Sequence, residues 1–192
     1  MALLEGKRMD LMEAIKGRRS VRRFGGAKVA PDALEKMLDA ARWAPSWANT
    51  QCWRFVVVGD AAKIAALKET MPERNPARPA FDTCSYVVAF IAKHGLSAYK
   101  RGEKVEERHW YMFDLGCCVQ NFCLAAHAMG AATVIVGLFD WRKANQILGV
   151  PEGYEVVCLV PIGTAETQPS APPRKPLQQL INYGTFRPDP AQ

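Results

Sequence analysis

The sequence predicts a sheet flanked by helices, in an α/β or α+β arrangement. Two observations lead to this class. Segments rich in β-branched and apolar residues alternate with segments in which apolar residues recur at helical spacing. The length of 192 residues, of which 49% are hydrophobic and 23% charged, suits one globular domain. The expected strands are 53–59, 85–92, 133–138 and 154–163.

The N-terminal part of the chain predicts three helices. Residues 9–17 form a short one, since their apolar residues lie four positions apart. A longer helix begins at Pro31, because proline is tolerated in a first helical turn. Its apolar stripe consists of Leu34, Leu38 and Ala41. After the first strand, Asp60 is expected to cap a third helix over residues 60–70.

Two later segments lack a regular pattern. Residues 71–83 contain three prolines in the eight positions from Pro72 to Pro79, and we expect a loop there. Residues 94–109 form a polar, charged excursion that is long enough to act as a lid. A further helix is expected over residues 140–148, before the last strand.

The stretch 110–129 is almost entirely apolar, and its length alone would suit a membrane span. Four polar residues interrupt it: Asp114, Gln120, Asn121 and His127. We therefore expect a buried helix and no membrane association. A helix that is apolar on nearly all sides must also be covered on nearly all sides. Because a second copy of the chain can supply that cover, 110–129 is predicted to be the core helix of a homodimer interface.

The C-terminal segment 164–192 differs in composition from the rest of the chain. It holds six of the thirteen prolines: Pro169, Pro172, Pro173, Pro176, Pro188 and Pro190. Such a segment cannot fold compactly alone. We expect residues 1–192 to form a single domain, with 164–192 as an extended arm that either moves freely or lies over another surface, such as a partner subunit.

Basic residues account for the formal net charge of +6, and four arginines lie within “GRRSVRR” at 17–23. Guanidinium groups beside a serine hydroxyl can bind a phosphate dianion. The candidates are Arg18, Arg19, Ser20 and Arg22, with Arg174 far away in the arm. A solvated basic turn explains the same residues equally well. A module that binds nucleic acid is more remote, because interleaved aromatic residues and a known motif are missing.

The N-terminal residues do not resemble a signal peptide, and a cytoplasmic location is expected. The six cysteines are then reduced thiols. Neither they nor the three histidines have the spacing of metal ligands, so no metal site is expected. No dinucleotide-binding or Walker A glycine motif is present in the sequence.

Four successive stretches resemble the signatures of the flavin-dependent nitroreductase family. They are “AIKGRRSVRRF”, “LEKMLDAARWAPSWANTQCWRFVVV”, “DLGCCVQNFCLAAHAMGAATVIVGLFD” and “PPRKPLQQLI”. They occur in the family's order and spacing and cover most of residues 11–181. The kernel A-P-S-x-x-N-x-Q-x-W is the most specific of them.

The resemblance implies an α+β fold with a central, mostly antiparallel sheet flanked by helices, in an intertwined homodimer. It also implies one FMN at each end of the dimer interface, with NADH or NADPH as electron donor. The oxidant would be a nitroaromatic, a quinone or a similar small molecule, reduced by a ping-pong hydride transfer. No catalytic side chain is expected, because the chemistry takes place at flavin N5.

The same resemblance assigns the residues that bind the cofactor. Arg18, Arg19 and Ser20 would hold the phosphate and ribityl chain, and Arg174 would return to the phosphate. Arg22 would face the N1/O2 edge of the flavin. The backbone at Val136 and Gly137 would lie beside N5. The other subunit would contribute Pro45, Ser46 and Asn49.

Alternatives within the same fold are a flavin reductase, a reductive dehalogenase and a flavin-fragmenting enzyme. The segment 71–83 matches no flavin-contacting pattern, and no site residue is assigned there. Trp43 and Trp53 are expected to be core residues at the ends of the 45–52 turn. Trp47 either lines the pocket or packs in the interface, and Cys52 is expected to be a small buried side chain.

Overall fold

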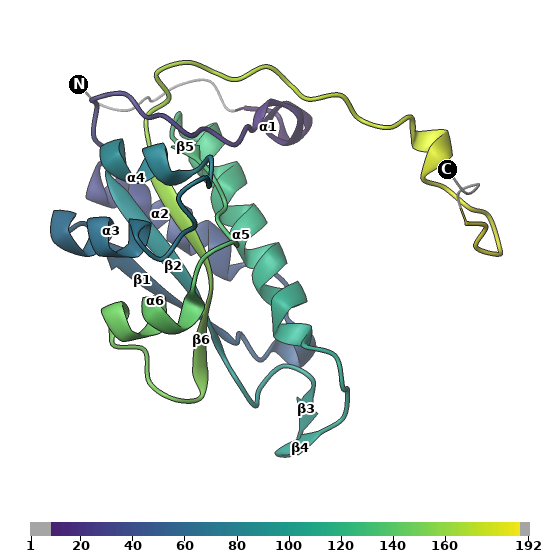
Figure 1. The fold of residues 1–192 in the computed structure, drawn as a ribbon. Helices are drawn as coiled ribbons and strands as arrows, with labels where there is room; N and C mark the ends of the chain where they lie inside the picture. Colours follow the sequence, from purple (N-terminus) through teal and green to yellow (C-terminus); the bar gives the residue numbers. More distant parts are fainter. Residues whose placement is uncertain (1–8, 189–192) are drawn as a thin grey trace.

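The computed structural model describes residues 9–188, and its centre is a four-stranded sheet in the order β1-β2-β6-β5 (Figure 1). The strands are β1 (Trp53–Val58), β2 (Tyr86–Lys93), β5 (Ala132–Thr133) and β6 (Tyr154–Gly163). All three neighbouring pairs are antiparallel. The predicted α+β class with a mostly antiparallel sheet is therefore confirmed.

Helices cover both faces of this sheet. On one face α2 (Pro31–Arg42) and α5 (Trp110–Ala128) pack against Val88, Phe90 and Ala92 of β2. The opposite face of β2 presents Val87, Ala89 and Ile91. That face is covered by α3 (Ala61–Lys68), α4 (Arg78–Thr83) and α6 (Trp141–Leu148). Burial on both sides explains why β2 is an unbroken apolar run.

Acidic caps begin several of the helices, as the sequence predicts for the third one. The Asp60 carboxylate accepts a hydrogen bond from the Lys63 amide at 2.8 Å. Asp140 accepts from the first turn of α6 in the same way, and Asp10 caps α1 (Leu11–Gly17). These carboxylates satisfy amides that have no partner within the helix. The expected helices are confirmed, with ends shifted by no more than two residues.

Two sequence predictions are wrong in this part of the molecule. The segment 71–83 is not only a loop, since α4 occupies its second half and carries Pro79 in the first turn, where proline is compatible with a helix. The strand expected at 133–138 ends after Thr133, and beyond it only Val136 forms an isolated bridge, to Leu159. The sequence does not reveal this end, because β-branched residues continue through Val134, Ile135 and Val136 although the strand pairing stops.

The remaining segments are irregular and exposed. The predicted lid carries a small hairpin of β3 (Tyr99–Lys100) and β4 (Glu103–Lys104). From Thr164 the chain runs extended, first beside residues 17–22 and then away from the body of the molecule, and η2 (Leu177–Gln179) is a helical turn within it (Figure 1). Among residues 9–188, no helix has the length and apolarity needed to cross a bilayer.

Candidate cofactor site

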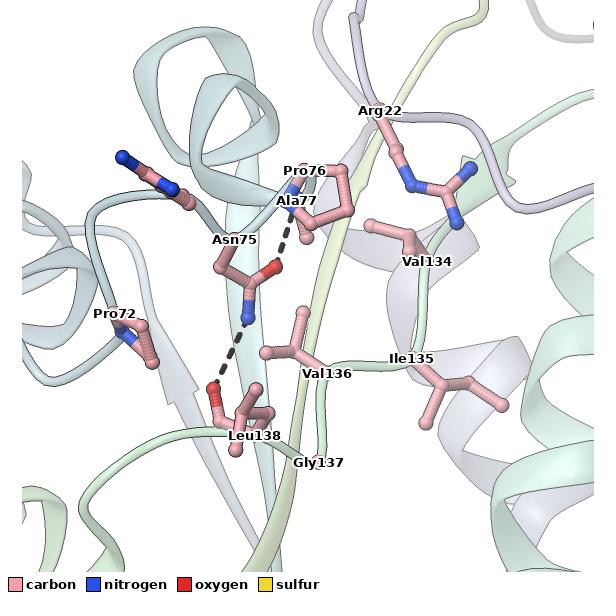
Figure 2. Close-up of a pocket in the computed structure, with 11 residues that line it drawn as sticks. Arg22, Pro72, Asn75, Pro76, Ala77, Val134, Ile135, Val136, Gly137 and Leu138 are labelled. Carbon is pink, nitrogen blue, oxygen red and sulfur yellow. Dashed lines mark hydrogen bonds between the residues drawn. The ribbon is translucent and has the colours of Figure 1, made fainter.

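Two adjoining cavities share the side chain of Arg22 and together form a trough along one edge of the sheet. The first, of about 370 Å³, is lined by Arg18, Arg19, Ser20, Arg22, Pro169, Ser170, Pro172 and Arg174. The second, of about 390 Å³, lies between residues 72–77 and 134–138 (Figure 2). We call them the cationic pocket and the apolar pocket. The sequence-predicted residues Arg18, Arg19, Ser20, Arg22 and Arg174 thus lie together, although Arg174 is distant in the sequence.

The arginine turn, residues 18–22, is attached to the sheet edge on both of its sides. Ser20 forms a bridge to Thr133, and the Val21 amide donates to the Thr133 carbonyl at 2.9 Å. Phe24 is buried at the end of β6, and a Cβ added to Gly163 would come within 2.7 Å of its ring. Because Val21 and Phe24 point into the core, the arginines between and beside them are left at the surface.

The arm covers the arginine turn from the other side. The Gln168 side-chain amide donates to the Gly17 carbonyl at 2.9 Å, which fixes the start of the arm over the turn. This contact brings Arg174 within reach of the cationic pocket. None of the described residues lining that pocket is acidic, so its charge is positive throughout.

Arg19 shows that the cationic pocket lacks an acceptor. Its Nη1 donates to the Arg18 carbonyl at 2.9 Å, whereas its Nε is buried and has no partner among the described residues. An orphaned guanidinium nitrogen in a pocket of arginines suits a bound anion with several oxygens.

The apolar pocket contains a residue to which the sequence analysis assigned no role, Asn75. Its Nδ2 donates to the Leu138 carbonyl at 3.1 Å, and its Oδ1 accepts from the Ala77 amide at 2.9 Å (Figure 2). Asn75 therefore joins the 72–77 loop to the 134–138 segment. The signal for it was an Asn-Pro pair within a proline-rich loop, which is typical of a fixed turn.

Of the two backbone amides at Val136 and Gly137, one is hydrogen-bonded and the other is free. The Val136 amide donates to Leu159 at 2.9 Å, and the Val136 carbonyl accepts from Leu159 in return. Within the described residues the Gly137 amide has no acceptor, and a Cβ added there would meet no atom within 4 Å. Of the two predicted residues, Gly137 is thus the one whose amide is free to donate.

Pro45, Ser46 and Asn49 do not line either pocket of their own chain. They belong to a turn around η1 (Trp47–Asn49), after α2 and beside the N-terminal half of α5. The Ser46 hydroxyl accepts from the Gln51 amide at 2.9 Å, which closes the turn. Pro45 and Asn49 are exposed.

The tryptophans around this turn differ from one another. Trp53 is buried, as predicted, and Cys52 is buried with it. The prediction that Trp43 is a core residue is wrong, since it is 72% exposed at the end of α2, with the guanidinium of Arg42 over its ring. Trp47 is half-buried and packs edge-on against Trp110, with 5.2 Å between ring centroids.

Comparison with known protein families shows to which family the chain belongs. The model of the nitroreductase family matches residues 15–164, which include the arginine turn, the 45–51 turn and the 134–138 segment. The chain belongs to the nitroreductase family. The match ends at residue 164. Residues 165–188, which run over and beyond the arginine turn, lie outside it.

Individual members of the family share sequence along nearly the whole chain. A protein of Lactiplantibacillus plantarum named CLA biosynthesis enone reductase is 38% identical over 193 residues, covering 83% of this chain and 88% of that protein. A protein of Methanothermobacter thermautotrophicus, named as an NADH dehydrogenase/NAD(P)H nitroreductase, is 27% identical over 172 residues. That match covers 86% of this chain and 84% of the relative.

Solved structures share the fold. A protein from Exiguobacterium sibiricum, described as a nitroreductase and solved in complex with FMN, superposes with a TM-score of 0.78 at 22% identity. The superposition covers 91% of this chain and 97% of that one. At 22% identity, this similarity shows a shared fold and nothing more. The shared fold agrees with the antiparallel sheet described above.

Proposed function

We propose that this nitroreductase family member is an FMN-dependent NAD(P)H oxidoreductase that reduces nitroaromatics, quinones or similar small oxidants as a homodimer. The observation that carries the proposal is the position of Arg22, which lines both the cationic and the apolar pocket. The trough therefore has a cationic end and a mainly apolar end, which Arg74 also lines, and Arg22 lies where the two meet. FMN has the matching parts, a phosphate dianion and a flat apolar ring system whose reduced form is anionic.

Each residue of the trough then has a role that follows from its position. Arg18, Arg19 and Ser20, together with Arg174, would hold the phosphate and ribityl chain, and the orphaned Nε of Arg19 would donate to a phosphate oxygen. The apolar walls at Val134 and Val136 would pack along the ring. Gly137 would donate its free amide at N5.

The electrostatics of the trough favour reduction of the ring. FMN held by these residues would supply the hydride chemistry at N5 between NAD(P)H and the oxidant. Arg22 would oppose negative charge at the N1/O2 edge, and it holds this position before any charge develops there. The exposed side chains of Ile135 and Leu138 border the apolar pocket and would limit the access of water to it.

The homodimer is supported by apolar surface that the single chain leaves open. On α1 the exposed residues include Leu11, Met12 and Ile15, and on α5 Met112 and Phe113. The arm exposes a third set, which consists of Leu177, Leu180, Ile181, Tyr183 and Phe186. Large apolar patches on several elements are typical of a protein interface. In the dimer, Pro45, Ser46 and Asn49 of one subunit would complete the trough of the other.

Purification and reduction of the protein test the proposal directly. We expect a dimer by light scattering and a yellow protein, or a colourless one that binds added FMN with loss of flavin fluorescence. Anaerobic stopped-flow mixing with NADH or NADPH should bleach the flavin, and a nitroaromatic or a quinone should restore its colour. Protein that binds no FMN, or bound flavin that neither nicotinamide reduces, would contradict the proposal.

A second candidate substrate is an α,β-unsaturated ketone. The relative named enone reductase, at 38% identity over most of both chains, favours it. Reoxidation of the reduced flavin by an enone would transfer hydride to the β-carbon, while a proton adds to the α-carbon. A panel that includes enones, nitroaromatics, quinones, free flavin and halogenated phenols separates this reaction from the flavin reductase and reductive dehalogenase alternatives.

A further inference from the structure

The only charged residue whose side chain is almost completely buried, among the described residues, is Asp114 on α5, with 1% of its surface exposed. The Trp47 amide donates to both of its carboxylate oxygens, at 3.1 and 3.2 Å. The Ser97 hydroxyl donates to Oδ2 at 2.7 Å. The Cys52 thiol lies 3.6 Å from the same oxygen. Removal of a carboxylate from water is costly, and these donors offset the cost.

Two of these donors, Trp47 and Cys52, flank a turn with unusual backbone geometry. Ala48, Asn49 and Gln51 have φ angles of 46°, 55° and 47°, in the left-handed region. None of them is glycine, and for residues with a Cβ this region is unfavourable relative to the ordinary helical region. Such a conformation persists only where the surroundings hold it.

The contacts that hold the turn are few. Ser46 closes it from inside through the Gln51 amide, and Asp114 fixes its first amide from outside. The exposed side chains of Ala48, Asn49 and Gln51 add little packing. Toward α5 the turn makes two contacts through Trp47, whose amide donates to the Asp114 carboxylate and whose ring packs on Trp110. Of these two, only the contact with Asp114 holds the backbone of the turn. Cys52 belongs to the same cluster, where burial, and then the charge of Asp114, raises the pKa of its thiol to about 12.

We propose that Asp114 is a positioning residue that presets the 46–51 turn, so that Asn49 is already placed to hydrogen-bond the flavin of the partner subunit. The inference rests on the proposed function, because it takes Asn49 as a flavin contact across the dimer. Asp114 itself reaches neither substrate nor cofactor. Its hydrogen bonds with the Trp47 amide stabilise the left-handed turn before the flavin binds. The free energy of ordering the turn is then not taken from the binding of the flavin.

The first test is the isosteric variant Asp114→Asn, measured in the full-length dimer by titration of the apoprotein with FMN. Asparagine keeps the shape but loses the charge and one acceptor oxygen. FMN affinity should fall about tenfold or more, the effect of losing hydrogen bonds to a charged group. The matched control is Ser97→Ala, which removes another donor from the same carboxylate but leaves the Trp47 contacts, and should change FMN affinity by less than about threefold.

A second substitution separates positioning of the turn from a general loss of stability. In the Asp114→Asn background, Ala48→Gly should restore part of the FMN affinity, because glycine adopts a positive φ without a Cβ penalty. In the wild-type background the same substitution should have little effect. If Asp114 served only to stabilise the core, a change of backbone freedom at an exposed turn would restore nothing.

Hydrogen exchange keeps the inference testable even if the Asp114→Asn variant does not fold. In the wild-type apoprotein the Trp47 amide should exchange slowly, at a rate close to that of core amides in α5, because it is held before the cofactor arrives. Fast exchange in the apoprotein that slows only when FMN is added would overturn the inference. Wild-type protein that binds no FMN would instead contradict the proposed function, so the two failures are distinguishable.

Discussion

The arginine turn at 18–22 and the turn at 45–51 are both assigned to one cofactor, yet the chain builds them differently. The arginine turn is joined to β5 through Val21 and Thr133, is anchored in the core by Phe24, and is covered by its own arm through Gln168. The 45–51 turn has three left-handed residues and is joined to α5 through Trp47, by its amide to Asp114 and by its ring to Trp110. It lines neither the cationic nor the apolar pocket of its own chain.

In the proposed site, the two halves therefore differ in whether they need a second subunit. The half that carries charge is complete within one chain, since Arg174 returns to Arg18 through the arm. The half that supplies Asn49 is preset but has nothing to bind in the same chain. A cofactor could therefore dock on one subunit by its phosphate, while full affinity would require the second subunit.

The largest expected effect comes from removing the anchor of the arginine turn. Phe24→Ala deletes a buried ring and should lower the free energy of unfolding by about 3–5 kcal/mol, measured by urea denaturation. The arginines should lose their alignment, and FMN affinity should fall with the stability. Val57→Ala on edge strand β1, where the side chain is 41% exposed, is the control and should cost less than about 1 kcal/mol. A stable Phe24→Ala protein with normal FMN affinity would show that the turn does not depend on its anchor.

The next effect isolates the phosphate end of the trough. Arg174→Ala removes a guanidinium from the cationic pocket and should weaken FMN binding by about 10- to 100-fold, the loss of one charge-assisted hydrogen bond. Riboflavin, which has no phosphate, should bind both proteins equally. Lys175→Ala is a matched control, because its side chain has the same charge but does not line the pocket. Equal losses for FMN and riboflavin would argue against a phosphate contact at Arg174.

The sequence predicted the charged half of the site better than the other features. Four motifs in the right order fix a family, and the strands and most helix ends follow from apolar patterning and caps such as Asp60. The early end of β5 after Thr133 could not be predicted, because the β-branched residues Val134, Ile135 and Val136 continue the pattern of a strand. Proline misled the assignment of α4, where Pro79 stands in the first helical turn.

One error and one omission of the sequence analysis have the same physical origin. Trp43 was expected in the core and Asn75 was given no role, because a residue type indicates burial or contact only on average. The orientation of Trp43 is decided by the end of α2, and that of Asn75 by hydrogen bonds to Ala77 and Leu138. The sequence analysis named Asp114 only as a polar interruption of the apolar stretch, and its buried contact with the Trp47 amide appears only in the structure.

An effect comparable in free energy to that of Arg174→Ala is expected at Arg22, which lines both pockets. Arg22→Gln should leave the dimer intact and lower the two-electron reduction potential of the bound flavin by roughly 30–65 mV, since a charge-assisted contact is worth about 1.5–3 kcal/mol. The neighbouring Arg23→Gln is the control, because Arg23 is exposed and lines neither pocket. Potentials measured against reference dyes check the prediction, and equal shifts in both variants would mean that Arg22 does not face the flavin.

The smallest expected effect is a change in one histidine of the charged half. His127 lies with Arg18 and Arg19 in a cavity beside the turn, where burial, followed by the two arginines, lowers its pKa below the usual value. As the pH falls below about 6.5, the unfolded chain takes up this proton before the folded one, so the free energy of unfolding should decrease. A phosphate dianion bound at the arginines would offset their charge, and FMN should therefore raise the pKa of His127. An NMR titration of the imidazole signals measures this shift, with His94, which lines a different cavity from His127, as the internal control. If FMN left the His127 titration unchanged while binding tightly, its phosphate would lie away from Arg18 and Arg19, and the two halves of the site would have to be reassigned.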